Sequence, residues 1–116
     1  MELTLADIWQ TREAWQTVMR LPVKAATALQ LIRLHRALEP ELKAVAEIQD
    51  RLINAHGKDG KLSAAMEGWP VFLKEMNEAL AVKVTIPDFS ITLPATVEID
   101  AATLMALEKW VKVEEK

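Results

Sequence analysis

Residues 21–56 read LPVKAATALQLIRLHRALEPELKAVAEIQDRLINAH, and this stretch decides the fold. Its apolar side chains recur at helical spacing on two faces. On one face they advance by three or four residues at a time, through Leu34, Leu38, Leu42, Val45, Ile48 and Leu52. A helix that is apolar on two sides lies in the middle of a domain. Pro22 suits the first turn of such a helix and Gly57 suits the position after its end, so we predict one long central helix.

Pro40 interrupts this helical pattern. A proline inside a helix removes one backbone hydrogen bond and clashes with the preceding turn, which predicts a kink near Leu38–Glu39. Because the apolar rhythm continues beyond the proline, we favour a kinked, continuous helix that ends at about His56.

Shorter helices flank the central one. Thr4 and Asp7 have the spacing of a capping box, which predicts a helix from about Leu5 to Met19. On the other side, Pro70 opens a helix that runs to about Leu80. We expect that helix to face the core through three apolar residues with Phe72 beside them: Leu73, Met76 and Leu80.

The apolar period then changes from 3.6 to 2. Residues 82–86 and 89–93 alternate apolar and polar side chains around Pro87-Asp88, which predicts a small hairpin, and residues 97–99 suggest a third short strand. Asp100 suits the N-cap of a last helix from Ala101 to about Lys112. The predicted fold is α+β and mainly helical, with a long kinked central helix and a small antiparallel sheet of two or three strands before a C-terminal helix.

Length and composition indicate one globular domain spanning residues 1–116, with 51% apolar and 27% charged residues. The absence of cysteine excludes disulfides, thiolate zinc sites and cysteine nucleophiles. A net charge of -3 argues against general nucleic-acid binding. The N-terminus lacks the pattern of a secretory signal, and no apolar run reaches the length of a membrane span, so we expect a cytoplasmic protein.

No segment carries a catalytic or cofactor signature. His35 and Glu39 stand four residues apart, but His56 lies several helical turns away, so we expect no metal site. The glycine-containing segment 57–61 lacks the pattern of a phosphate-binding loop and is interpreted as a surface turn. We therefore expect no enzymatic activity, no cofactor and no metal.

The candidate functional residues are those of a binding surface. Trp15 and Trp110 lie on or beside inward stripes, whereas Trp9 and Trp69 lack a clear inward partner and are candidate anchors for a protein partner. The edge of the small sheet is a second candidate, where Lys83 either contacts a partner or blunts the edge.

A basic pair is the candidate for an anionic ligand. Arg33 and Arg36 share one side of the central helix, in a stretch without acidic residues. The other cations of that stretch project elsewhere, so the alternative interpretation is a solvated flank of a buried helix.

Several segments together resemble a family of small uncharacterised proteins encoded by phages and prophages. The resemblance lies in the order of proline-punctuated helices and short strands: LPVKAA at 21–26, LEPELK at 38–43, RLI at 51–53, VTI at 84–86, ITL at 91–93, VEID at 97–100 and the helix 104–110. This chain departs from the family in its four tryptophans and in the turn at 56–63. The resemblance implies a phage or prophage setting, inside a bacterial host cell, and carries no activity or catalytic residues with it.

Three hypotheses follow for the function. The leading one is a non-enzymatic protein-interaction domain that serves as an accessory in virion assembly, with a homo-oligomer of this chain as one possible arrangement. The second is an inhibitor that occupies a host enzyme or defence complex, for which a host protein would be the sole partner. The third is a module that binds a small ligand or nucleic acid through Arg33 and Arg36.

Overall fold

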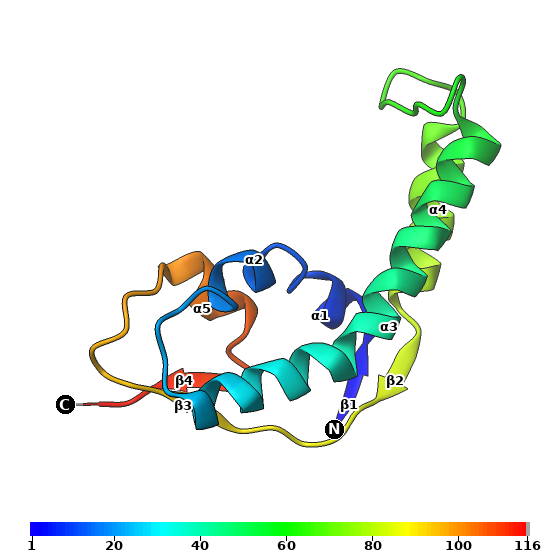
Figure 1. Cartoon of the computed structure of the whole chain (residues 1–116). Coiled ribbons are helices and arrows are strands. Elements are labelled where there is room, and N and C mark those ends of the chain that lie inside the picture. Colours follow the sequence, from blue (N-terminus) through cyan, green and yellow to red (C-terminus); the bar gives the residue numbers. More distant parts are fainter. Residues whose placement is uncertain (116) are drawn as a thin grey trace.

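The computed structural model describes residues 1–115 and shows an α+β fold that is mainly helical (Figure 1). In chain order the elements are β1 (Glu2–Thr4), α1 (Leu5–Trp9), α2 (Ala14–Val18), α3 (Ala25–His56), α4 (Trp69–Leu80), β2 (Lys83–Thr85), β3 (Ile91–Leu93), α5 (Ala101–Ala106) and β4 (Val111–Val113).

The long central helix is α3, which has 32 residues and spans about 48 Å at the usual helical rise. It contains Pro40 without a break, and its ribbon changes direction part-way along (Figure 1). The predicted kinked, continuous helix ending at His56 is therefore confirmed. It begins at Ala25 rather than at Pro22, because Lys24 still has extended backbone as the N-cap residue.

The molecule consists of a body and a projecting arm (Figure 1). The first half of α3 lies in the body with α1, α2, α5 and both sheets. The second half, residues 42–56, packs against α4, and together with the connection 57–68 these form what we call the helical arm. The arm makes the molecule 53 Å long but only 26 and 20 Å across. Its radius of gyration is 16.8 Å, compared with about 13 Å for a compact chain of this length.

The hydrophobic core surrounds the first half of α3. Leu34 and Leu38 are completely buried there, as are Ile8 of α1, Leu93 of β3 and Leu107 after α5. The side chains of Trp15 and Trp110 are also buried in this core, as their place near the apolar stripes predicts. The burial of each large apolar side chain stabilises the folded state by roughly 1.5–3 kcal/mol.

The predicted helix Leu5–Met19 is wrong in one respect, because it is divided into α1 and α2. The capping box at its start is present, with Thr4 Oγ1 accepting from the Asp7 amide at 3.2 Å and Asp7 Oδ2 accepting from the Thr4 amide at 3.1 Å. The chain then turns at Thr11, whose amide donates to the Ile8 carbonyl, three residues back, at 3.0 Å. Helical spacing alone did not reveal this turn, since the apolar residues on both sides of it still face the core.

The predicted hairpin is also wrong. The strand β2 pairs antiparallel with the N-terminal β1, in the register Glu2↔Thr85, and β3 pairs parallel with the C-terminal β4, in the register Ile91↔Val111. The structure therefore has two separate two-stranded sheets (Figure 1). The partner of a strand depends on contacts between distant segments of the chain. The alternation of apolar and polar residues within one segment predicts a strand but does not identify its partner.

Two C-terminal elements also differ from the prediction. Residues 97–99 form no strand, and α5 ends at Ala106 instead of Lys112, which belongs to β4. The predicted N-cap is confirmed: Asp100 accepts from the amide of Thr103 at 3.1 Å and from its hydroxyl at 2.6 Å. These hydrogen bonds hold the pKa of the Asp100 carboxyl below its ordinary value.

Candidate functional site

The tip of the helical arm is held by close backbone contacts. A Cβ atom on Gly68 would lie 2.0 Å from the His56 carbonyl oxygen, so only glycine lets the start of α4 approach the end of α3 this closely. At the tip itself, Asp59 and Gly60 have φ angles of 54° and 72°, and Lys58 forms a bridge with Lys61. Two left-handed residues in succession form a tight turn, which agrees with the surface turn predicted for this segment.

A side-chain pair ties the two helices of the arm together below the tip. His56 Nε2 lies 3.1 Å from Glu75 Oε2, and both side chains are partly exposed. The pair carries opposite charges when the imidazole is protonated. It fixes the register of α4 along α3.

The helix α4 carries apolar side chains outside its contact with α3. Phe72 and Met76 are buried against α3, and Pro70 lies in the first turn of the helix as predicted. Leu73 was expected to face the core, but it is 41% exposed. At helical spacing it lies on one flank of α4 with Trp69, because the two residues are four positions apart. We call this pair the Trp69–Leu73 patch.

The patch lies toward the outer end of the arm. Trp69 is partly buried, and its ring packs on that of Phe72 with 5.4 Å between the centroids. Val71, 45% exposed, lies on the opposite flank of α4. The arm therefore presents apolar surface on both sides of the α3–α4 contact, in a part of the molecule that projects away from the body (Figure 1).

Trp9, the other candidate anchor, lies in the body on α1. It is partly buried, and the guanidinium carbon of Arg12 lies 4.6 Å from its ring centroid. Arg12 also donates to the Trp9 carbonyl at 2.8 Å. A cation–π contact of this kind covers one ring face with a group of the same chain. Trp9 and Trp69 thus belong to different parts of the molecule and form no common surface.

Lys83 lies on β2, opposite Thr4 of β1. Its Nζ is 3.6 Å from Glu2 Oε1, and both side chains are exposed. The edge of β2 that was considered as a docking site is therefore partly covered by β1, and Lys83 takes part in a cross-strand ion pair of the kind that contributes a few tenths of a kcal/mol.

Arg33 and Arg36 are exposed on the first half of α3, as predicted for a solvated helix flank. Arg36 lines a shallow hollow at the bend of α3 with Glu39, Pro40 and Lys43. The carboxylate of Glu39 lies inside that hollow and offsets the nearby positive charge. A hydrogen bond from Lys43, at 2.8 Å, holds the pKa of Glu39 below its ordinary value and raises the pKa of Lys43.

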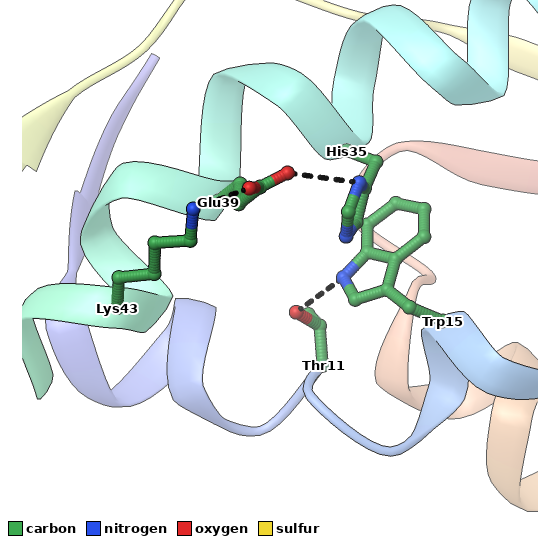
Figure 2. Close-up of polar contacts among 5 residues, drawn as sticks. All are labelled: Thr11, Trp15, His35, Glu39 and Lys43. Atoms are coloured by element: carbon green, nitrogen blue, oxygen red, sulfur yellow. Dashed lines mark hydrogen bonds and ion pairs between the residues drawn. The ribbon is translucent and has the colours of Figure 1, made fainter. Parts of the chain in front are cut away.

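A chain of polar contacts leads from this hollow into the core (Figure 2). Glu39 Oε2 lies 3.6 Å from His35 Nδ1, and the His35 ring packs edge-on against Trp15 with 5.0 Å between centroids. Trp15 Nε1 donates to Thr11 Oγ1 at 3.0 Å, and that hydroxyl donates to the Ile8 carbonyl at 2.7 Å.

The polar chain joins α3 to the turn between α1 and α2. Sequence reasoning missed Thr11, although its spacing of four residues from Trp15 is the signal that could have found it. His35 lies between the Trp15 ring and the Glu39 carboxylate, so it connects the buried aromatic ring to the charged pair on the surface of α3. In residues 1–115 no group of three or more His, Asp or Glu side chains is placed to hold a metal ion.

A second apolar surface lies between α5 and β4. A hollow there is lined by Leu104, Met105, Val111 and Val113, with Glu108 and Lys112 at its polar side. Met105 is 69% exposed, the highest value for a large apolar side chain in the part of the chain described. Sequence analysis missed this surface because it placed Val111 and Lys112 at the end of a helix.

Within residues 1–115, no helix combines the length and the apolar character needed to cross a membrane. Comparisons of the chain with protein-family models, with curated proteins and with solved structures return no match.

Proposed function

We propose that this chain is a non-enzymatic protein-interaction protein of a phage or prophage, which acts as an accessory in virion assembly inside the bacterial host cell. The observation that carries the proposal is the helical arm, which holds the Trp69–Leu73 patch away from the body (Figure 1). The phage setting is supported by the resemblance of the segments quoted above. The binding role is supported by the arm.

The arm suits a partner that receives a helix in an apolar groove. Helix-in-groove recognition uses side chains at spacings of three, four and seven residues on one helix. Trp69 and Leu73 have such a spacing on α4, and Leu80 continues the same flank seven residues after Leu73. Trp is the residue type most often found at the energetic centre of a protein interface.

The arm is also suited to binding because close contacts hold its two helices together without a partner. The close approach of Gly68 to His56 and the contact between His56 and Glu75 fix α4 against α3. A surface that is already ordered loses less conformational entropy on binding than a flexible one.

The test is a comparative capture from phage-infected cells with Leu73→Glu. Glutamate keeps the helix propensity of this position but places a charge in the patch. The matched control is Gln16→Glu, which adds the same charge at an exposed position on α2 in the body. Both proteins are first checked for unchanged helix content by circular dichroism.

We expect the wild type and Gln16→Glu to recover the same virion or assembly protein, and Leu73→Glu to lose it. Recovery of that protein by all three baits would refute the arm as the binding surface. Recovery of a stoichiometric host protein instead of a phage protein would replace the assembly role with the inhibitor hypothesis.

A further inference from the structure

The free edge of β4 has the properties of a dimer interface. Because β4 pairs with β3 alone, the opposite edge of the strand has no strand partner in residues 1–115. That edge borders the hollow beneath the exposed Met105. We propose that two copies of this chain associate by pairing their β4 strands antiparallel across a two-fold axis at Val113.

The backbone directions of β4 are set by its bonds to β3. The Trp110 carbonyl accepts from the Ile91 amide and the Glu114 amide donates to the Leu93 carbonyl, both at 2.8 Å. Because successive residues of a strand direct their backbone groups to alternate sides, the amide and carbonyl of Val113 point away from β3. Two copies related by a two-fold axis therefore satisfy both groups by a reciprocal pair of bonds at Val113.

The same alternation limits the register. The Val111 amide already donates to the Leu107 carbonyl at 2.9 Å, so Val111 offers only its carbonyl at the free edge. With Val113 on the axis, this carbonyl meets the amide of Glu115 in the other copy. With Lys112 on the axis, Val111 and Val113 would face each other, and because the Val111 amide is occupied, only the bond from the Val113 amide to the Val111 carbonyl could form in each half. That register therefore makes fewer hydrogen bonds between the strands than the register with Val113 on the axis.

Charge selects between these two registers. The side chains of Lys112 and Glu114 are exposed on the outer face of the strand. With Val113 on the axis, each Lys112 stands directly opposite Glu114 of the other copy, and the symmetry makes this contact twice. With Lys112 on the axis, the two lysines would stand opposite each other, and directly opposed like charges destabilise a strand pair.

The second copy also covers apolar surface. Its β4 lies along the mouth of the hollow that is lined by Leu104, Met105 and Val113. Exposed strand edges beside apolar side chains are the surfaces on which chains pair with one another. This proposal concerns the body and stands independently of the function proposed for the arm.

The test measures the monomer–dimer equilibrium of the full chain by sedimentation equilibrium at low ionic strength. Lys112→Glu and Glu114→Lys each place like charges opposite one another twice per dimer. We expect each single variant to weaken dimerisation about tenfold or more, and the double variant Lys112→Glu/Glu114→Lys to return to within about threefold of the wild type. Lys109→Glu is the matched control, since it makes the same charge change at an exposed position outside the pairing register, and it should leave the equilibrium unchanged.

A wild-type chain that stays monomeric at about 0.5 mM overturns the proposal, because the dissociation constant of the dimer would then lie well above that concentration. A dimer whose affinity ignores both single variants places the interface elsewhere. A double variant as weak as the single ones shows that Lys112 and Glu114 are not opposed, which refutes the register. Circular dichroism of each variant confirms that the chain is folded.

Discussion

Replacing Thr11 with valine should lower the free energy of unfolding by about 2 kcal/mol. The hydroxyl of Thr11 is completely buried and donates to the Ile8 carbonyl. It also accepts from Trp15 Nε1, as Figure 2 shows. Valine has nearly the same shape, so it creates no cavity. The Ile8 carbonyl keeps the bond from the Thr11 amide, but Trp15 Nε1 loses its acceptor in a ring that is 5% exposed. Leaving one buried donor unpaired costs roughly 1–3 kcal/mol.

Urea denaturation followed by far-ultraviolet circular dichroism measures this change in the free energy of unfolding. In thermal unfolding of a chain of this length, about 2 kcal/mol corresponds to a fall in Tm of about 8 °C. Thr17→Val is the matched control, because Thr17 is exposed on α2, and its effect should stay within about 0.5 kcal/mol.

A double-mutant cycle with Trp15→Phe isolates the hydrogen bond from the other effects. Phenylalanine removes the donor, so Thr11→Val should cost less in that background, by about 1 kcal/mol. If Thr11→Val unfolds at the same urea concentration as the wild type, the hydroxyl does not supply the acceptor that Trp15 needs. Equal costs of Thr11→Val in both backgrounds would refute the contact as well.

Three further outcomes are expected from other parts of the chain. The lowered pKa of Glu39 and the raised pKa of Lys43 mean that their pair stabilises the fold between their ordinary values of 4.5 and 10.5. The stability advantage of the wild type over Glu39→Gln should therefore be present in that window, fall as the pH drops through the lowered pKa of Glu39, and fall as the pH rises through the raised pKa of Lys43, as measured by urea titration at each pH. Pro40→Ala should raise the free energy of unfolding by about 1–2 kcal/mol, since proline is unfavourable inside a helix; a loss of stability would show that the bend itself is needed for packing. Gly68→Ala should destabilise the arm by about 1–3 kcal/mol because its methyl group meets the His56 carbonyl, and faster hydrogen exchange confined to α4 and the end of α3 would report it.

Helices were predicted well where a local signal marks their ends. The end of α3 at His56 coincides with Gly57, although Gly57 has extended backbone rather than the left-handed conformation expected of a glycine after a helix. The start of α4 follows from Pro70, and the start of α5 follows from the side chain of Asp100. These signals act within one helical turn, so neighbouring residues contain the information. The turn at Thr11 was missed because the apolar residues on both sides of it keep helical spacing and face the same core.

The candidate binding residues were predicted only in part. Trp9 was predicted to lack a clear inward partner, and the structure shows it partly buried with Arg12 on its ring, a contact that the sequence did not reveal. Leu73 was expected to face the core, but α4 packs mainly on α3 and to a smaller extent on α1, which leaves the flank with Leu73 exposed. The exposure of Met105 depends on the early end of α5, which no local signal marked.

The sequence by itself determined the long helix α3 with its bend at Pro40, the helix α4, the capping residues and the absence of cysteine chemistry, because each depends on residue type and on spacing within a few positions. Only the tertiary structure decided how the strands pair. The N-terminal β1 pairs with β2, and β3 pairs with the C-terminal β4, whereas the predicted hairpin would have paired β2 with β3. The physical reason is that a three-residue strand gains most of its stability from the partner and the core that it contacts. Those contacts join distant segments of the chain. The exposed flank of α4 and the free edge of β4 depend on the same contacts, so the sequence alone did not predict them.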